Sequence, residues 1–180
     1  MSILEPTLNY FSYGASAHMA VITALLGRNP TRRGIHQRLD DYKLVTQRLD
    51  QVPDRVLHSA PIPKSARRIL QEAWPTGFRS YTIVPCKGEH VKGQVYEIAE
   101  KERELILEWE LVPFGWMREF KEVKVEGGGI FYCTTEGLGI GQSYDRDFAV
   151  QNDLPPPLLT DQDRLIKTAI RVGEEFRARR

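Results

Sequence analysis

The sequence predicts a single domain of the α+β class, and three features of the 180-residue chain indicate it. The aromatic run from Tyr10 to Gly14 has the composition of a strand and is followed at once by a helical pattern. The segment from Tyr81 to Ile98 contains two β-branched and aromatic stretches separated by turn residues. The end of the chain carries apolar residues at helical spacing. A chain of this length can bury one hydrophobic core.

Composition excludes several classes of function. The net charge is +1 with 27% charged residues, so nothing favours a nucleic-acid partner. No apolar run approaches the roughly 20 residues that span a bilayer, and the N-terminus lacks the pattern of a signal peptide. Cys86 and Cys133 lie far apart in strand-like contexts and are expected to be reduced, buried thiols. We therefore expect a soluble cytoplasmic protein with no membrane partner.

A short helix is predicted directly after Gly14. Ser16 is expected to cap its N-terminus, and Gly27 to end it. His18 has no second metal-ligating residue nearby, so we expect it at the surface or rim of the domain and not in a metal site.

The next stretch alternates between loop and strand patterns. Residues 28–38 are polar and basic and are predicted to form a loop, whereas Tyr42 to Val45 is predicted to be a strand. Residues 51–77 contain four prolines and form either an insertion or a cover over an active site. The sequence leaves both alternatives open.

A hairpin and a helix are predicted in the middle of the chain. The hairpin joins residues 81–84 to residues 91–98 through a turn at 87–89. The helix covers residues 99–110 and carries Glu108 and Glu110 in its last turn, where the helix dipole disfavours negative charge. At least one of the two carboxylates is expected to have a specific partner; the alternative is that both are solvated.

The last part of the chain is predicted to form two strands, over residues 119–126 and 130–133, and a terminal helix that begins near Thr160. The glycines between 137 and 141 do not have the spacing of a dinucleotide-binding loop. We expect residues 1–150 to form the body and residues 151–180 to dock on it, with a dimer interface as the alternative use of the terminal helix. The basic residues at the end are expected to be solvated. The apolar stripe of the helix consists of Leu165, Ala169, Val172 and Phe176.

Three stretches resemble motifs of one protein family. Residues 10–14 read Y-F-S-Y-G, residues 81–98 contain Y-T-I-V-P and V-K-G-Q-V-Y-E-I, and residues 107–110 read L-E-W-E, with Trp116 and Arg118 downstream. In this order they resemble the F-x-Y-G loop, the apolar hairpin and the L-D-x-[YFW]-E helix end of the γ-glutamyl cyclotransferase-like family, which includes the γ-glutamylamine cyclotransferases and the plant AIG2-like proteins. The resemblance covers residues 8 to 134.

This resemblance implies a fold and an activity. The fold would be a small mixed, mainly antiparallel β-barrel with helices packed outside, in a monomer or weak homodimer. The substrate would be a γ-glutamyl amide that cyclises to 5-oxoproline and releases an amine, with Glu110 as the general acid/base and without a metal or cofactor. The alternative is a non-catalytic small-molecule-binding protein, or a regulatory or interaction protein, on the same fold. The implied substrate-binding residues are Tyr13, Gly14, Ala15, Ser16, Trp116 and Tyr132.

Overall fold

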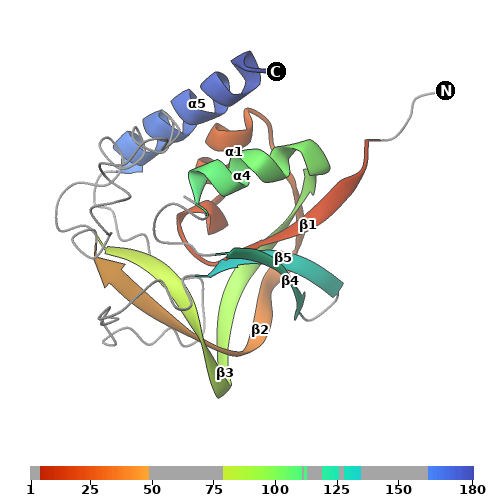
Figure 1. Ribbon diagram of the computed structural model, residues 1–180, viewed down its shortest axis with the longest axis vertical. Coiled ribbons are helices and arrows are strands. Elements are labelled where there is room, and N and C mark those ends of the chain that lie inside the picture. Colours follow the sequence, from red (N-terminus) through yellow and green to blue (C-terminus); the bar gives the residue numbers. More distant parts are fainter. Residues whose placement is uncertain (1–4, 49–78, 111, 113–118, 126–127, 135–161) are drawn as a thin grey trace.

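The computed structural model describes residues 5–48, 79–110, 112, 119–125, 128–134 and 162–180. They form five strands, three α-helices and two short 3-10 helices (Figure 1). In chain order the elements are β1 (Thr7–Ser12), η1 (Ala15–Ala17), α1 (Met19–Leu26), β2 (Thr31–Arg48), β3 (Arg79–Ala99), η4 (Glu100–Glu102), α4 (Arg103–Trp109), β4 (Glu119–Val125), β5 (Gly128–Thr134) and α5 (Gln162–Ala178).

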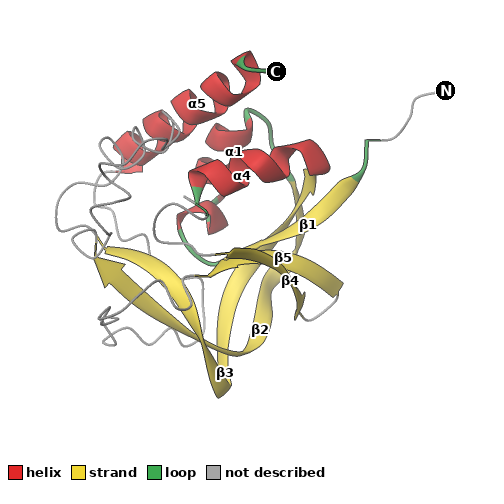
Figure 2. Ribbon diagram, viewed as in Figure 1, coloured by secondary structure: helices red, strands yellow, loops and turns green. Residues whose placement is uncertain are grey.

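The strands form one mixed, mainly antiparallel sheet in the order β2-β3-β1-β5-β4. β1 pairs antiparallel with β3 and parallel with β5, and the pairs β2–β3 and β4–β5 are antiparallel. The helices α1, α4 and α5 gather on one side of this sheet (Figure 2). The predicted α+β class is confirmed. Among the described strands β2 and β4 are the edges of the sheet, and its closure into a barrel stays a prediction.

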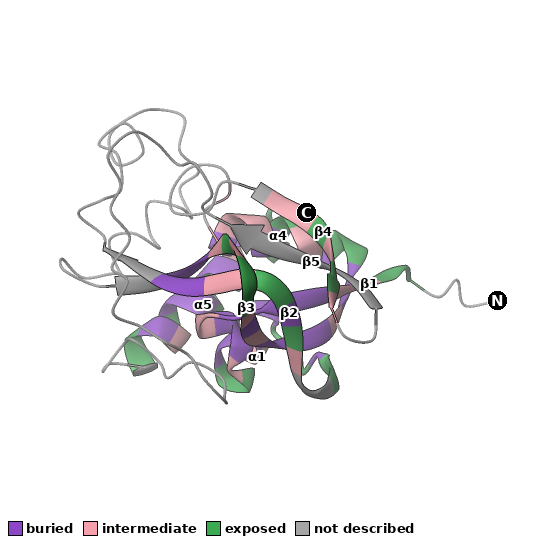
Figure 3. Ribbon diagram, turned by 90° about the horizontal axis from the view of Figure 1, so that it is seen from below, coloured by how far each residue is buried: buried purple, intermediate pink, exposed green. Residues whose placement is uncertain are grey.

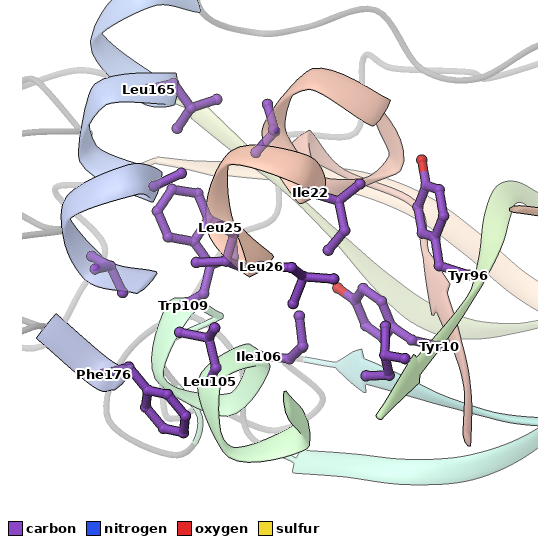
Figure 4. Packing of buried hydrophobic residues seen from close by; sticks show 14 residues of the cluster. Tyr10, Ile22, Leu25, Leu26, Tyr96, Leu105, Ile106, Trp109, Leu165 and Phe176 are labelled. Atoms are coloured by element: carbon purple, nitrogen blue, oxygen red, sulfur yellow. The ribbon is translucent and has the colours of Figure 1, made fainter. Parts of the chain in front are cut away.

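The alternation of side chains along β1 divides the core into two clusters. Tyr10 faces the helices, whereas Phe11 belongs to the cluster on the other face of the sheet. Buried residues run along the inner faces of α1 and α5 and along the middle of the sheet (Figure 3). The helix-side cluster joins Tyr10, Val21, Ile22, Leu25, Leu26, Tyr96, Ile98, Leu105, Ile106, Trp109, Leu165, Ala169, Val172 and Phe176 (Figure 4).

The predicted loop over residues 28–38 is wrong from Thr31 onward. β2 runs from Thr31 to Arg48 and includes the predicted strand at residues 42–45. Its basic residues suit an edge strand because their side chains reach solvent and pair there. Arg33 pairs with Glu97 of β3, and Arg38 pairs with Asp40.

The predicted hairpin within residues 81–98 is also wrong, since both stretches belong to the single strand β3 and pair with β2. Asp40 pairs with His90 and Tyr42 with Pro85, so Asp41 alone lies opposite residues 86–89. Asp41 has a φ of 62° and Gly88 a φ of 84°. The Gly88 N–H donates to Asp41 Oδ1 at 3.0 Å. The turn residues therefore form a bulge in a continuing strand, not a reversal of the chain.

The helices begin and end close to the predicted positions. Gly27 ends α1 with a φ of 70°, as predicted. The predicted cap at Ser16 is wrong, because Ser16 lies inside η1 and the residue before α1 is His18, which makes no side-chain capping bond. The predicted helix at 99–110 forms as η4 followed by α4, with Glu110 directly after the last helical residue.

The terminal helix α5 packs on the body of the domain through the predicted stripe, and all four residues of the stripe are buried. The basic residues at its end are exposed, as expected, and they also bind other parts of the fold. Arg177 Nη1 donates to the carbonyl oxygens of Leu25 (3.3 Å) and Leu26 (3.0 Å) at the end of α1. Two further ion pairs tie the end of α5 to α4, Arg179–Glu108 and Arg180–Glu104.

Replacing Arg177 by methionine is expected to destabilise the fold by about 1 kcal/mol, since the last carbonyl groups of α1 lose a charged donor. For a chain of this size the melting temperature should fall by about 2–4 °C. Thermal unfolding measures this change. Lys167→Met, which removes an exposed charge from the same helix, is the control and should leave the melting temperature within about 1 °C of wild type.

Other expectations concern β5, the cysteines and segments outside the described residues. The strands predicted at 119–126 and 130–133 form as β4 and β5.

Cys86 is free but partly exposed, so the expectation of burial is wrong for it; Cys133 lies in β5. None of the described helices is long and apolar enough to cross a membrane. Residues 51–77, the glycines between 137 and 141, and Thr160 lie outside the described residues.

Candidate active site

Glu110 follows the last residue of α4, and its side chain is partly buried against β1 and η1. Its N–H donates to the Ile106 carbonyl at 2.9 Å, so its backbone continues the last helical turn. The negative end of the helix dipole disfavours a carboxylate at this position. A charge held there needs donors from outside the helix.

Two hydroxyl groups supply those donors. Tyr10 OH donates to Glu110 Oε1 at 2.9 Å, and Ser16 Oγ donates to the same oxygen at 3.2 Å. Trp109 Nε1 in turn donates to Ser16 Oγ at 3.0 Å. Residues from β1, η1 and α4 therefore meet at one carboxyl group, and Tyr10 and Trp109 are both part of the helix-side cluster (Figure 4).

The sheet fixes the positions of these groups. Tyr10 lies opposite Tyr96 in the β1–β3 register, so both side chains rise from the same face. Tyr96 OH donates to the Ala17 carbonyl at 2.6 Å and so holds η1 above the sheet. The hydroxyl groups of Tyr10 and Tyr96 both have a partner, as buried polar groups require.

The surroundings of Glu110 change its acidity. Burial raises the pKa of the Glu110 carboxyl above its usual range, and the hydrogen bonds from Tyr10 and Ser16 oppose this increase. Among the described residues no cation forms an ion pair with this carboxyl. A carboxyl with a raised pKa can accept a proton and return it near neutral pH.

Glu108, two residues earlier, has a different partner. Arg179 Nη2 donates to both of its carboxylate oxygens, at 2.9 and 2.7 Å. The expectation that at least one of the two glutamates has a specific partner is confirmed, and neither is simply solvated. Glu108 serves the docking of α5, whereas Glu110 points into the body of the domain.

The structure brings some of the predicted site residues together. Ser16 contacts Glu110, and Gly14 and Ala15 directly precede it in the same turn. The Gly14 and Ala15 carbonyls accept the N–H groups of Ala17 and His18. The N–H groups of Ala15 and Ser16, in the first turn, have no acceptor within the part of the chain that the structure describes.

Among the other predicted site residues, Tyr13 does not join this group. The Tyr13 side chain is buried on the other face of the sheet, with its ring centroid 6.3 Å from that of Phe11. Tyr132 lies in β5 opposite Lys121, and Trp116 is outside the described residues. The roles predicted for these residues stay predictions.

The sequence did not predict that Tyr10 contacts Glu110 or that Trp109 contacts Ser16. A signal for Tyr10 was present, because β1 alternates and places Tyr10 on the opposite face from Tyr13. A buried tyrosine also needs a partner for its hydroxyl group. Over the described ranges, no group of three His, Cys, Asp or Glu side chains could hold a metal ion.

Comparison with known proteins shows the fold. No family model matches the chain, and no curated protein matches it. The chain is similar to the solved structure of an uncharacterized protein from Homo sapiens, with a TM-score of 0.52 and 19% identity over 97% of this chain and 88% of that chain. It is also similar to a gamma-glutamyl cyclotransferase structure, with a TM-score of 0.52 and 18% identity over 96% of this chain and 88% of that chain. The resemblance found in the sequence is confirmed at the level of the fold.

Proposed function

We propose that this protein is a γ-glutamyl cyclotransferase-like enzyme that converts a γ-glutamyl amide to 5-oxoproline and releases an amine or an amino acid. The observation that carries the proposal is the contact between Glu110, at the end of α4, and Ser16, in the turn after Tyr13 and Gly14. These two segments are the ones that the sequence resemblance pairs in one site. The shared fold supports the proposal.

The reaction needs few groups. A γ-glutamyl compound carries its own nucleophile, the α-amine, within reach of its γ-carbonyl carbon, so holding the folded substrate supplies much of the rate. At neutral pH the amine is protonated and must lose a proton first. Glu110 takes this proton, the amine nitrogen bonds to the γ-carbonyl carbon, and the bond to the leaving nitrogen breaks. Glu110 gives this proton to the leaving nitrogen, then takes the second proton of the ring nitrogen and passes it to the released amine, which leaves as an ammonium ion, so the reaction consumes no water.

Binding would involve the turn beside Glu110. In this proposal the N–H groups of Ala15 and Ser16 hold the α-carboxylate of the substrate, and the α-amine then faces Glu110. Trp116 and Tyr132 would line the remainder of the pocket. The substrate is a small molecule, and the proposed reaction uses no metal, nucleic acid or membrane.

A substrate screen tests the proposal. The purified protein is incubated separately with γ-glutamyl amines, γ-glutamyl dipeptides and glutathione, and 5-oxoproline is measured by mass spectrometry. We expect release of 5-oxoproline from at least one class. Compounds that raise the melting temperature without being converted would instead support the non-catalytic alternative on the same fold.

A further inference from the structure

We propose that Tyr10 and Ser16 are positioning residues that hold one oxygen of Glu110, Oε1, and thereby reserve the other, Oε2, for the proton that the reaction moves. This inference rests on the proposed function and names the atom that would do its chemistry. It also assigns a role to Tyr10, which lies on β1, one hundred residues from Glu110 in the sequence.

Both hydroxyl groups donate to the same oxygen. Tyr10 OH lies 2.9 Å and Ser16 Oγ 3.2 Å from Oε1. Within the described part of the chain, no group donates to Oε2. Donors that converge on one carboxylate oxygen stabilise negative charge on that oxygen and occupy its lone pairs. A proton arriving at the carboxyl group therefore binds to Oε2.

The direction of the Ser16 hydroxyl is also fixed. Its oxygen accepts the Trp109 Nε1–H at 3.0 Å, and a serine hydroxyl has a single proton to donate. That proton is directed to Oε1. Tyr10, Ser16 and Trp109 are each no more than 3% exposed, so water does not compete for these bonds. The carboxyl group is held from β1, η1 and α4 together.

Among the described residues, Tyr10 is the one titratable group that bonds to this carboxyl. Glu108, its neighbour on α4, is paired with Arg179 of α5. The Arg103 guanidinium lies 5.7 Å from the centre of the Phe120 ring, and that ring lies 5.9 Å from the Tyr10 ring. Of the described side chains, Tyr10 and Ser16 are the ones that lower the pKa of Glu110 against the effect of burial. Removing either donor should therefore raise that pKa.

The inference gives the proton a defined path. Oε2 accepts a proton from the α-ammonium group of the substrate, and the freed amine forms the new C–N bond. When the bond from the γ-carbonyl carbon to the leaving nitrogen breaks, Oε2 returns the proton to that nitrogen, and it then carries the second proton of the new ring nitrogen to the released amine, which leaves as an ammonium ion. Throughout, Oε1 keeps its two hydrogen bonds, so the carboxyl group does not rotate between the two steps.

The test uses the full chain with Tyr10→Phe, which removes the donor and keeps the ring that packs on Phe120. Tyr96→Phe is the matched control, because it removes a buried hydroxyl group from the same face of the sheet that is bonded to Ala17 and not to Glu110. The Glu110 carboxyl is titrated by carbon-13 NMR in substrate-free protein. Tyr10→Phe should move its midpoint to higher pH, and Tyr96→Phe should leave it in place. An unchanged midpoint in Tyr10→Phe would overturn the inference.

Two further measurements follow from the same variants. In the pH profile of kcat/KM, the acid limb should move to higher pH in Tyr10→Phe, with roughly tenfold lower activity below the midpoint. Neutron diffraction of the wild-type protein below that midpoint should show the deuteron on Oε2; a deuteron on Oε1 would contradict the assignment. The NMR titration and the neutron diffraction need no substrate. If the protein converts no γ-glutamyl compound, yet the midpoint shifts in Tyr10→Phe and the deuteron lies on Oε2, the proposed function is refuted and the positioning of Glu110 by Tyr10 and Ser16 still stands.

Discussion

Replacing Glu110 by glutamine is expected to abolish the release of 5-oxoproline and leave the fold intact. The amide oxygen of glutamine can accept the hydrogen bonds that Tyr10 and Ser16 donate to Oε1, so the packing around it persists. The amide cannot accept the proton of the α-ammonium group, and loss of a general base costs about 10²- to 10⁴-fold in rate. Release of 5-oxoproline by the wild type and the variant, at equal concentration, measures this loss.

Glu108→Gln is the control for this result. The same substitution two residues away removes the ion pair with Arg179 and leaves the groups around Glu110 in place. A partly exposed ion pair contributes little to the free energy of unfolding, so the variant should stay folded with its site intact. We therefore expect its turnover to stay within about threefold of wild type. Residual turnover in Glu110→Gln close to that of Glu108→Gln would refute the assignment of the base.

The same glutamine variant should change how stability depends on pH. Burial raises the pKa of Glu110 in the folded state, so this residue favours folding at low pH and loses that contribution as pH rises through the folded-state pKa. Glutamine does not ionise. The melting temperature of Glu110→Gln relative to wild type should therefore increase as pH rises through this range, as measured by thermal unfolding in a series of buffers. A constant difference would contradict the raised pKa.

Replacing Gly93 by alanine is expected to destabilise the fold by about 3 kcal/mol or more, the largest stability effect among these variants. A Cβ atom at this position would lie 2.5 Å from the Ser12 carbonyl oxygen and 2.6 Å from the Phe11 ring. β1 and β3 are neighbours in the sheet, so neither strand can move away without breaking their pairing. A loss of this size should lower the melting temperature by about 6–12 °C.

Gly14→Ala is the matched control for Gly93→Ala. The nearest atom to its added Cβ would be Tyr81 Cβ at 3.9 Å, an ordinary contact. Its melting temperature should stay within about 2 °C of wild type. Equal losses in the two variants would show that the crowding at Gly93 is relieved by movement of the strands. The crowding gives a physical reason for the glycine in the motif V-K-G-Q-V-Y-E-I.

Local patterns predicted the elements whose partners are near in sequence or whose spacing is regular. The strand and turn at Tyr10 to Gly14, the helix that ends directly before Glu110, and the buried stripe of α5 are of this kind. Each was predicted from the periodicity of its apolar residues or from a glycine that ends a strand or helix. Both signals can be read within about 15 residues of sequence.

Features that depend on distant partners could not be read locally. Residues 31–38 look like a loop because their charges find partners only when β2 pairs with β3, as in Arg33 with Glu97. Residues 87–89 look like a hairpin turn because a bulge opposite Asp41 uses the same residue types. Ser16 resembles a helix cap, yet its hydroxyl bonds to Glu110, ninety-four residues away.

The bond from Arg177 to the end of α1 has a consequence for biosynthesis. It joins residues more than 150 positions apart, and α1 also buries Leu25 against the helix-side cluster that α5 completes. During translation α1 therefore leaves the ribosome long before its covering helix exists. The nascent chain therefore carries an uncovered apolar surface on α1 until α5 has been synthesised.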